Sequence, residues 1–110
     1  MYWAELEPRS GSEQRGRRPV VIVSHDAFND AASWNSLIVV PVSTSLAQGA
    51  RTRTTVTIAR GTAGLSHESV VVCHQVTTLD RAKLRRRIGT LTASAMDEVG
   101  AALRVAMQLL

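Results

Sequence analysis

Residues 6–26 read LEPRSGSEQRGRRPVVIVSHD, and the contrast between their two halves indicates the fold. The first half, residues 7–18, is polar and interrupted by proline and glycine, which is the composition of a loop. Residues 20–23 are then four β-branched side chains in a row, a run that favours a buried strand. Residues 2–6 alternate weakly and predict a shorter strand before the loop.

Further strands are predicted along the middle of the chain. They cover residues 37–42, 52–58 and 69–75, with residues 76–78 continuing the last one. Pro41 cannot donate to a strand ladder, so it predicts an edge or a bulge. Residues 25–36 form a polar connector with room for one turn of helix. Residues 80–87 predict a short basic helix and residues 88–91 a strand after it.

Helical periodicity is clear in the C-terminal segment. Apolar side chains recur there at steps of three and four residues, at Ala95, Met96, Val99, Ala102, Leu103, Ala106, Met107 and Leu110. Ser94 followed by Asp97 predicts the capped start of this helix, and the stripe with Met96 and Met107 is expected to be core. The predicted fold class is mainly β with α (α+β), a curved antiparallel sheet closed partly into a barrel with a helix on it.

Size and composition indicate one compact domain over residues 1–110. Cys73 is the single cysteine, which favours a reducing compartment. We find no signal-peptide pattern and no apolar stretch near the ~20 residues of a membrane helix, so a soluble, cytoplasmic protein without membrane contact is expected.

The charge is basic, with a formal net charge of +4, and Lys83 is the one lysine among 13 basic residues. Arginine offers a planar fork of donors that fits phosphate. Twelve of these basic residues fall into three groups, which are Arg9, Arg15, Arg17 and Arg18; Arg81, Lys83, Arg85, Arg86 and Arg87; and Arg51, Arg53 and Arg60. Such clusters suit a polyanion, while arginine-rich codon usage and solvated faces give the same pattern.

In residues 6–26, Gly11-Ser12-Glu13-Gln14 is followed by Arg18-Pro19 and the β-branched run. This order of residues resembles that of the MazF/PemK family of toxins, the mRNA interferases of type II toxin–antitoxin systems. Residues 75–80, QVTTLD, are similar to the family's Q-x-R-T-[IV]-D, and residues 38–44, IVVPVST, to its strand ending in Pro-x-Thr-Ser. With residues 89–91 and the final helix, the resemblance covers nearly the whole chain.

This resemblance implies a MazF/CcdB-like fold, a partly closed SH3-like barrel, and a sequence-specific endoribonuclease. The family cuts single-stranded mRNA without a metal or other cofactor, through attack of the 2′-hydroxyl, leaving a 2′,3′-cyclic phosphate and a 5′-hydroxyl. The implied partners are single-stranded RNA, a cognate MazE-like antitoxin that inhibits the toxin, and a second copy in a homodimer. Operator DNA would be contacted only through the antitoxin.

Site residues follow from the same motifs. Arg18 stands at the family's catalytic arginine and Ser43 at its catalytic threonine, with Thr44 able to replace Ser43 if the register shifts by one. Glu13 matches a glutamate implicated in activity or loop order, and His74 aligns with an acidic residue proposed as proton donor. The implied substrate-binding residues are Arg15, Arg17, Gln14, Thr44, Gln75 and Thr77.

The chain departs from the family pattern in three places. Ser43 replaces threonine, Thr77 replaces arginine, and Met1 stands without the few residues that usually precede the first strand. Each candidate also has an ordinary interpretation when taken alone. These are a solvated Arg18, a strand-end Ser43 bonded to backbone, a Glu13 paired with Arg15 or Arg17, and a structural His74.

Two further functions remain open from sequence. A CcdB-like gyrase-binding toxin would share the fold without needing Arg18 and Ser43, and a catalytically weak homologue would bind RNA uncut. A metal site is not expected, because Cys73 and His74 are neighbours that point to opposite faces of a strand, and the other histidines show no ligand spacing with them. Trp3 is expected in the core, and Trp34 is open to stacking on bases.

Overall fold

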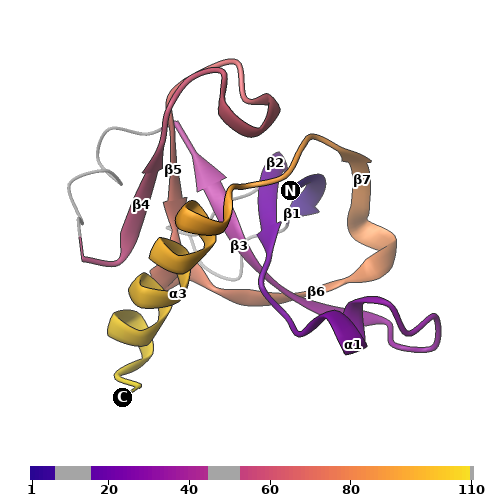
Figure 1. The fold of residues 1–110 in the computed structure, drawn as a ribbon. Helices are drawn as coiled ribbons and strands as arrows, with labels where there is room; N and C mark the ends of the chain where they lie inside the picture. Colours follow the sequence, from indigo (N-terminus) through magenta and orange to yellow (C-terminus); the bar gives the residue numbers. More distant parts are fainter. Residues whose placement is uncertain (7–15, 45–52, 110) are drawn as a thin grey trace.

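The computed structural model describes residues 1–6, 16–44 and 53–109, and within them the chain forms one antiparallel seven-stranded sheet with a C-terminal helix (Figure 1). The strands are β1 (Tyr2–Leu6), β2 (Gly16–Ile22), β3 (Ser36–Ser43), β4 (Thr55–Ile58), β5 (Ser69–Val72), β6 (Thr77–Asp80) and β7 (Leu84–Arg87). The helices are α1 (Asp26–Asn29) and α3 (Ala93–Met107), with 3-10 turns η1 (Thr62–Gly64), η2 (Cys73–Gln75) and η3 (Arg81–Lys83). The predicted α+β class and the helical turn in the connector are confirmed.

Strand β3 is the centre of the sheet. It pairs with β2 on one side, while on the other side its first half pairs with β6 and its last two residues pair with β5. Pro41 lies where the second neighbour changes from β6 to β5, so its missing N–H falls at a break in that ladder. The prediction of an edge position was therefore wrong, and the irregularity that a proline requires is supplied by the change of partner.

The apolar runs of β2 and β3 are long because both of their faces are buried. Val20, Leu37 and Val39 enter one hydrophobic cluster with Ala4, and Leu6, Ile22, Leu79 and Leu84 pack against it. The alternate residues Val21, Val40 and Val42 enter a larger cluster that includes Val99 of α3. Successive side chains of a strand point to opposite faces, so one pair of strands contributes to both cores.

The segment after β5 differs from its prediction. The strand ends at Val72, η2 turns the chain, and β6 then pairs with the first half of β3. The predicted basic helix is only the turn η3, followed by β7, and residues 88–91 form no strand. Leu84 of β7 pairs with Ala4 of β1 and packs on the smaller cluster, so tertiary pairing outweighs the helical propensity of arginine and leucine.

Helix α3 covers the larger cluster. Its N-cap is Thr92, whose side-chain oxygen accepts a hydrogen bond from the Ala95 amide at 3.1 Å, so the predicted start at Ser94 was two residues late. Its buried residues are Ala95, Val99 and Ala102. Met96 is 36% and Met107 47% exposed, so these two were wrongly predicted as core. No helix in the described part is long and apolar enough to cross a membrane.

The loop from β4 to β5 is held against the end of β7 by two glycines. Gly64 has φ +82°, and a Cβ there would lie 2.5 Å from the carbonyl oxygen of Ile88. A Cβ on Gly89 would overlap the carbonyl oxygen of Ala63. Since only glycine permits such close approach of two backbones, this contact fixes the loop relative to β7.

The glycine contact predicts a stability difference between two alanine variants. Gly89→Ala should lower the free energy of unfolding by about 1–3 kcal/mol, because the new methyl group forces two backbones apart. The matched variant Gly100→Ala should raise it by about 0.5–1 kcal/mol, since a Cβ meets nothing within 4 Å at this helical position. Urea denaturation measures both values. Equal stability of the two variants would contradict the proposed role of the contact.

Candidate functional site

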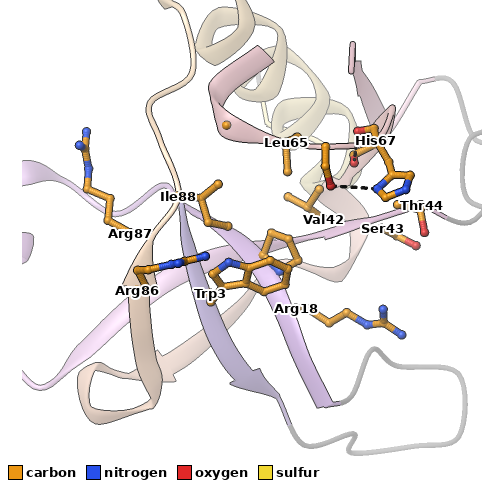
Figure 2. A pocket seen from close by; sticks show the side chains of 14 residues that line it. Trp3, Arg18, Val42, Ser43, Thr44, Leu65, His67, Arg86, Arg87 and Ile88 are labelled. Atoms are coloured by element: carbon orange, nitrogen blue, oxygen red, sulfur yellow. Dashed lines mark hydrogen bonds between the residues drawn. The ribbon is translucent and has the colours of Figure 1, made fainter. Parts of the chain in front are cut away.

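The register of β2 and β3 places Arg18, near the start of β2, beside Ser43, at the end of β3. Val20 pairs with Pro41, and the same register continued by two residues sets Arg18 opposite Ser43. Both residues line a pocket of about 480 Å³ (Figure 2). Ser43 is buried, while Thr44, which also lines the pocket, is exposed. The structure therefore brings together three residues that the motifs selected.

The described lining of the pocket comes from five parts of the chain. Trp3 comes from β1, Arg18 and Pro19 from β2, and Arg86 and Arg87 from β7, whose end continues into Ile88 (Figure 2). The remaining lining residues are Val42, Ser43 and Thr44 at the end of β3, and Gly64, Leu65, Ser66, His67 and Ser69 from the β4–β5 loop and the start of β5. Guanidinium and hydroxyl groups over an apolar floor suit a phosphate bearing an organic group.

The arginines near the pocket have different surroundings. Arg17 lies 3.3 Å from the carboxylate of Glu5, which partly balances its charge. In the described part of the chain, neither the Arg18 nor the Arg86 side chain has a hydrogen bond or ion pair. Both side chains are exposed, so their donors are available to an anion entering the pocket.

The other arginines of the second basic group support the fold. Arg81 donates to the carbonyl oxygens of Trp34 and Phe28, at 3.1 and 3.2 Å. Arg85 donates to the carbonyl of Ala82 at 2.8 Å, and Arg87 donates to the Thr90 hydroxyl. Of this group, only Arg86 and Arg87 reach the described pocket lining.

Trp3 differs from its sequence interpretation, whereas Trp34 is exposed. Trp3 was expected in the core, but it is partly exposed, pairs with Pro19 in the β1–β2 ladder and lines the pocket. Trp34 is 47% exposed and stacks on Phe28, with ring centroids 4.9 Å apart. Trp34 does not line the pocket, so Trp3 is the tryptophan placed beside Arg18.

The remaining site candidates lie elsewhere or outside the described residues. His74 and Gln75 belong to η2, and Thr77 begins β6; none of them lines the pocket. The Nδ1 atom of His74 lies 3.0 Å from the Thr54 hydroxyl, and the buried Oε1 atom of Gln75 has no hydrogen-bond partner in the described part. Glu13, Gln14 and Arg15 lie outside the described residues.

Cys73 is excluded as a nucleophile by its surroundings. The side chain is fully buried, and desolvation raises the pKa of its thiol to about 11. The thiol therefore stays protonated near neutral pH, whereas nucleophilic attack and metal binding both need the thiolate. Among the described residues, no group of three histidine, cysteine or acidic side chains is arranged to hold a metal.

Sequence reasoning missed His67, Trp3 and Ser66 as members of this pocket. The basic cluster did indicate Arg86, because clustered arginines favour anion binding. For His67 no comparable signal existed, since its place at the pocket depends on how the β4–β5 loop folds against Gly89.

Comparisons with known proteins agree on one family and one fold. Residues 1–107 match the family described as "PemK-like, MazF-like toxin of type II toxin-antitoxin system". The Mycobacterium tuberculosis toxin MazF-mt6 is similar, with TM-score 0.81 and 26% identity over 99% of this chain and 96% of that one. An endoribonuclease in complex with its cognate antitoxin from a mycobacterial species gives TM-score 0.76 and 25% identity, over 99% and 91%. MazF from Deinococcus radiodurans gives TM-score 0.76 and 25% identity, over 97% and 91%.

Proposed function

The chain belongs to the PemK/MazF-like family of type II toxin–antitoxin toxins, and on that premise we propose that it is a sequence-specific, metal-independent endoribonuclease acting on single-stranded mRNA. One similar solved structure is of an endoribonuclease bound to its antitoxin. The observation that carries the proposal is the meeting of Arg18 and Ser43, from two strands, in one pocket.

In the proposed mechanism the scissile phosphate binds at Arg18. The 2′-hydroxyl attacks phosphorus, the bond to the 5′-oxygen breaks, and the products are a 2′,3′-cyclic phosphate and a 5′-hydroxyl. Arg18 balances the charge that develops on the non-bridging oxygens, and the Ser43 hydroxyl donates a hydrogen bond to one of them. Thr44 is the neighbouring hydroxyl in the same pocket. Arg86 extends the cationic surface along the RNA backbone.

The other proposed contacts come from the motif match. Glu13 is proposed to take part in the reaction or to order its segment, Gln14 and Arg15 are proposed as RNA contacts from the same motif, and Arg17 as a contact from the start of β2. Gln75 and Thr77 are proposed as contacts for neighbouring nucleotides, on the η2–β6 segment. His74, beside Gln75, keeps the role of proton donor that the resemblance gives it, although its side chain does not line the pocket.

The proposed partners are a second copy of the chain, in a homodimer, and a cognate MazE-like antitoxin that inhibits the toxin by blocking its RNA-binding surface. Operator DNA would be contacted only through that antitoxin. Helix α3 presents exposed apolar side chains at Met96, Val105 and Met107, which provide surface for protein contacts. Sedimentation of the chain, alone and with the antitoxin encoded beside it, tests both partners.

Two parallel incubations distinguish the proposed function from its two alternatives. The purified chain is incubated with a long RNA in EDTA, and separately with gyrase and plasmid DNA. RNA cleavage supports the endoribonuclease. Gyrase-dependent DNA breaks would instead support a CcdB-like poison, and RNA that is bound but uncut would support a catalytically weak homologue.

Cleavage is predicted to persist in EDTA and to leave 5′-hydroxyl ends. The described lining of the pocket supplies guanidinium and hydroxyl groups, which stabilise a phosphorane directly, and no carboxylate for a divalent cation. Polynucleotide kinase should therefore label the product 5′ ends without prior treatment. Ends that need a phosphatase first, or loss of cleavage in EDTA, would contradict this chemistry.

Arg18→Ala is predicted to abolish cleavage while the protein still folds. Arg18 is exposed and lies at the start of a strand, so its loss should cost little stability. Loss of its contact to the developing charge should cost about 3 kcal/mol or more of transition-state stabilisation, a rate loss of at least about 10²-fold. The matched control Arg85→Ala removes the same charge from β7 outside the described pocket lining, and should cut near the parent rate. An Arg18→Ala protein whose circular dichroism spectrum shows a folded chain, and which cleaves RNA at the parent rate, would contradict the proposed role of Arg18.

A further inference from the structure

His74, the proton donor that the motif match suggests, does not line the pocket, whereas a second histidine, His67, does. The leaving 5′-oxygen needs a proton, because an alkoxide is a poor leaving group. Arginine keeps its proton in proteins, and the hydroxyls of serine and threonine do not ionise near neutral pH. Among the described lining residues, His67 is the one whose side-chain type exchanges a proton near neutral pH.

The fold holds His67 at the pocket rather than leaving it on a free loop. Leu65 is buried beneath the loop, and Gly64 packs against the backbone of Ile88. The carbonyl oxygen of His67 accepts a hydrogen bond from the Ser69 hydroxyl at 3.0 Å. The backbone on both sides of the imidazole is thus fixed by contacts with the sheet.

The imidazole itself is oriented by its neighbour. The Ser66 hydroxyl lies 3.0 Å from Nδ1 of His67, and Figure 2 shows this contact beside the end of β3 that carries Ser43 and Thr44. In the described part of the chain, Nε2 has no hydrogen-bond partner. One ring nitrogen is therefore held while the other is available to a substrate.

We propose that His67 is the general acid of the cleavage reaction, donating a proton from Nε2 to the 5′-oxygen. This inference rests on the proposed endoribonuclease function and adds a residue to it. As the 2′-hydroxyl loses its proton to water and its oxygen forms a bond to phosphorus, the bond from phosphorus to the 5′-oxygen breaks. That oxygen takes the proton of the imidazolium, so the products are the cyclic phosphate, a 5′-hydroxyl and neutral His67. Solvent then returns the proton to the imidazole.

The pH dependence has a definite sign. The donor must carry its proton, so the rate should fall as the pH rises. Among the described residues, the charged side chains that line the pocket are Arg18 of β2 and Arg86 and Arg87 of β7, and Glu68 follows His67 in the sequence. Arginine and glutamate side chains do not ordinarily titrate near neutral pH. Burial and the charge of Arg87 lower the pKa of the Met1 amino group, but that group is common to every variant compared.

The first test compares histidine variants over the pH range. Single-turnover cleavage is measured from about pH 5 to about pH 9, at a site mapped with the wild type. His67→Gln should fold, since the side chain is exposed, and should be slower by about 10²–10⁴-fold at the acidic end, with a flat profile. The control His25→Gln alters an exposed histidine at α1, outside the described pocket lining, and should keep the parent profile. A His67→Gln protein with the parent rate and profile overturns the inference, as does a profile flattened by His74→Gln instead.

The second test separates proton donation from positioning. A substrate with sulfur in place of the scissile 5′-oxygen has a thiolate leaving group, which departs without a proton. His67→Gln should cut this substrate at nearly the wild-type rate. A defect of the same size on both substrates overturns the role of acid and leaves a positioning residue. A wild type that cuts neither RNA sets aside the proposed function itself, an outcome distinct from either result for His67.

Discussion

The pairing of β2 with β3 is the interaction on which the rest of the structure depends, because these two strands are buried on both faces. Val20 and Val39 pack in one core while Val21 and Val40 pack in the other. Polar side chains of these strands are therefore accommodated only at the strand ends, beyond the two hydrophobic cores. Since the strands are antiparallel, the start of β2 and the end of β3 extend beyond the cores at the same end of the strand pair. Arg18 and Ser43 lie there. The site is a consequence of how the cores are built.

The same constraint brings the other walls of the pocket to this end. The last residue of β3 pairs with Val70 of β5, so the loop before β5 begins beside Ser43. On the far side of β2, β1 places Trp3 opposite Pro19, and β7 is paired to β1. Segments that range from Trp3 to Ile88 in the sequence thus surround one pocket. Gly89 then connects the two sides, because Ala63 of the β4–β5 loop packs directly on its backbone.

Sequence predicted the elements whose cause is local and failed where the cause is tertiary. The β-branched runs of β2 and β3 and the periodicity of α3 are visible within a few residues, and all three elements formed. The basic segment before Ile88 became β7 because Leu84 finds an apolar cluster beside Ala4, a contact invisible in the segment itself. At the candidate site, Arg18 and Ser43 were selected by the family resemblance, and the structure places both in one pocket. Trp3 and His67 were not selected, because their places depend on β1 pairing and on loop packing.

The arginines show why composition alone could not locate the site. A net charge of +4 favours a polyanion but assigns no residue to it. In the structure, Arg81 and Arg85 bind backbone carbonyls and Arg17 faces Glu5, so a large part of the basic count is used within the protein. Arg18 and Arg86 differ in having no such partner among the described residues while lining the pocket. A guanidinium that already binds a carbonyl must give up that bond to hold a phosphate. The surroundings of Arg18 and Arg86 among the described residues therefore locate the proposed anion-binding surface better than the net charge does.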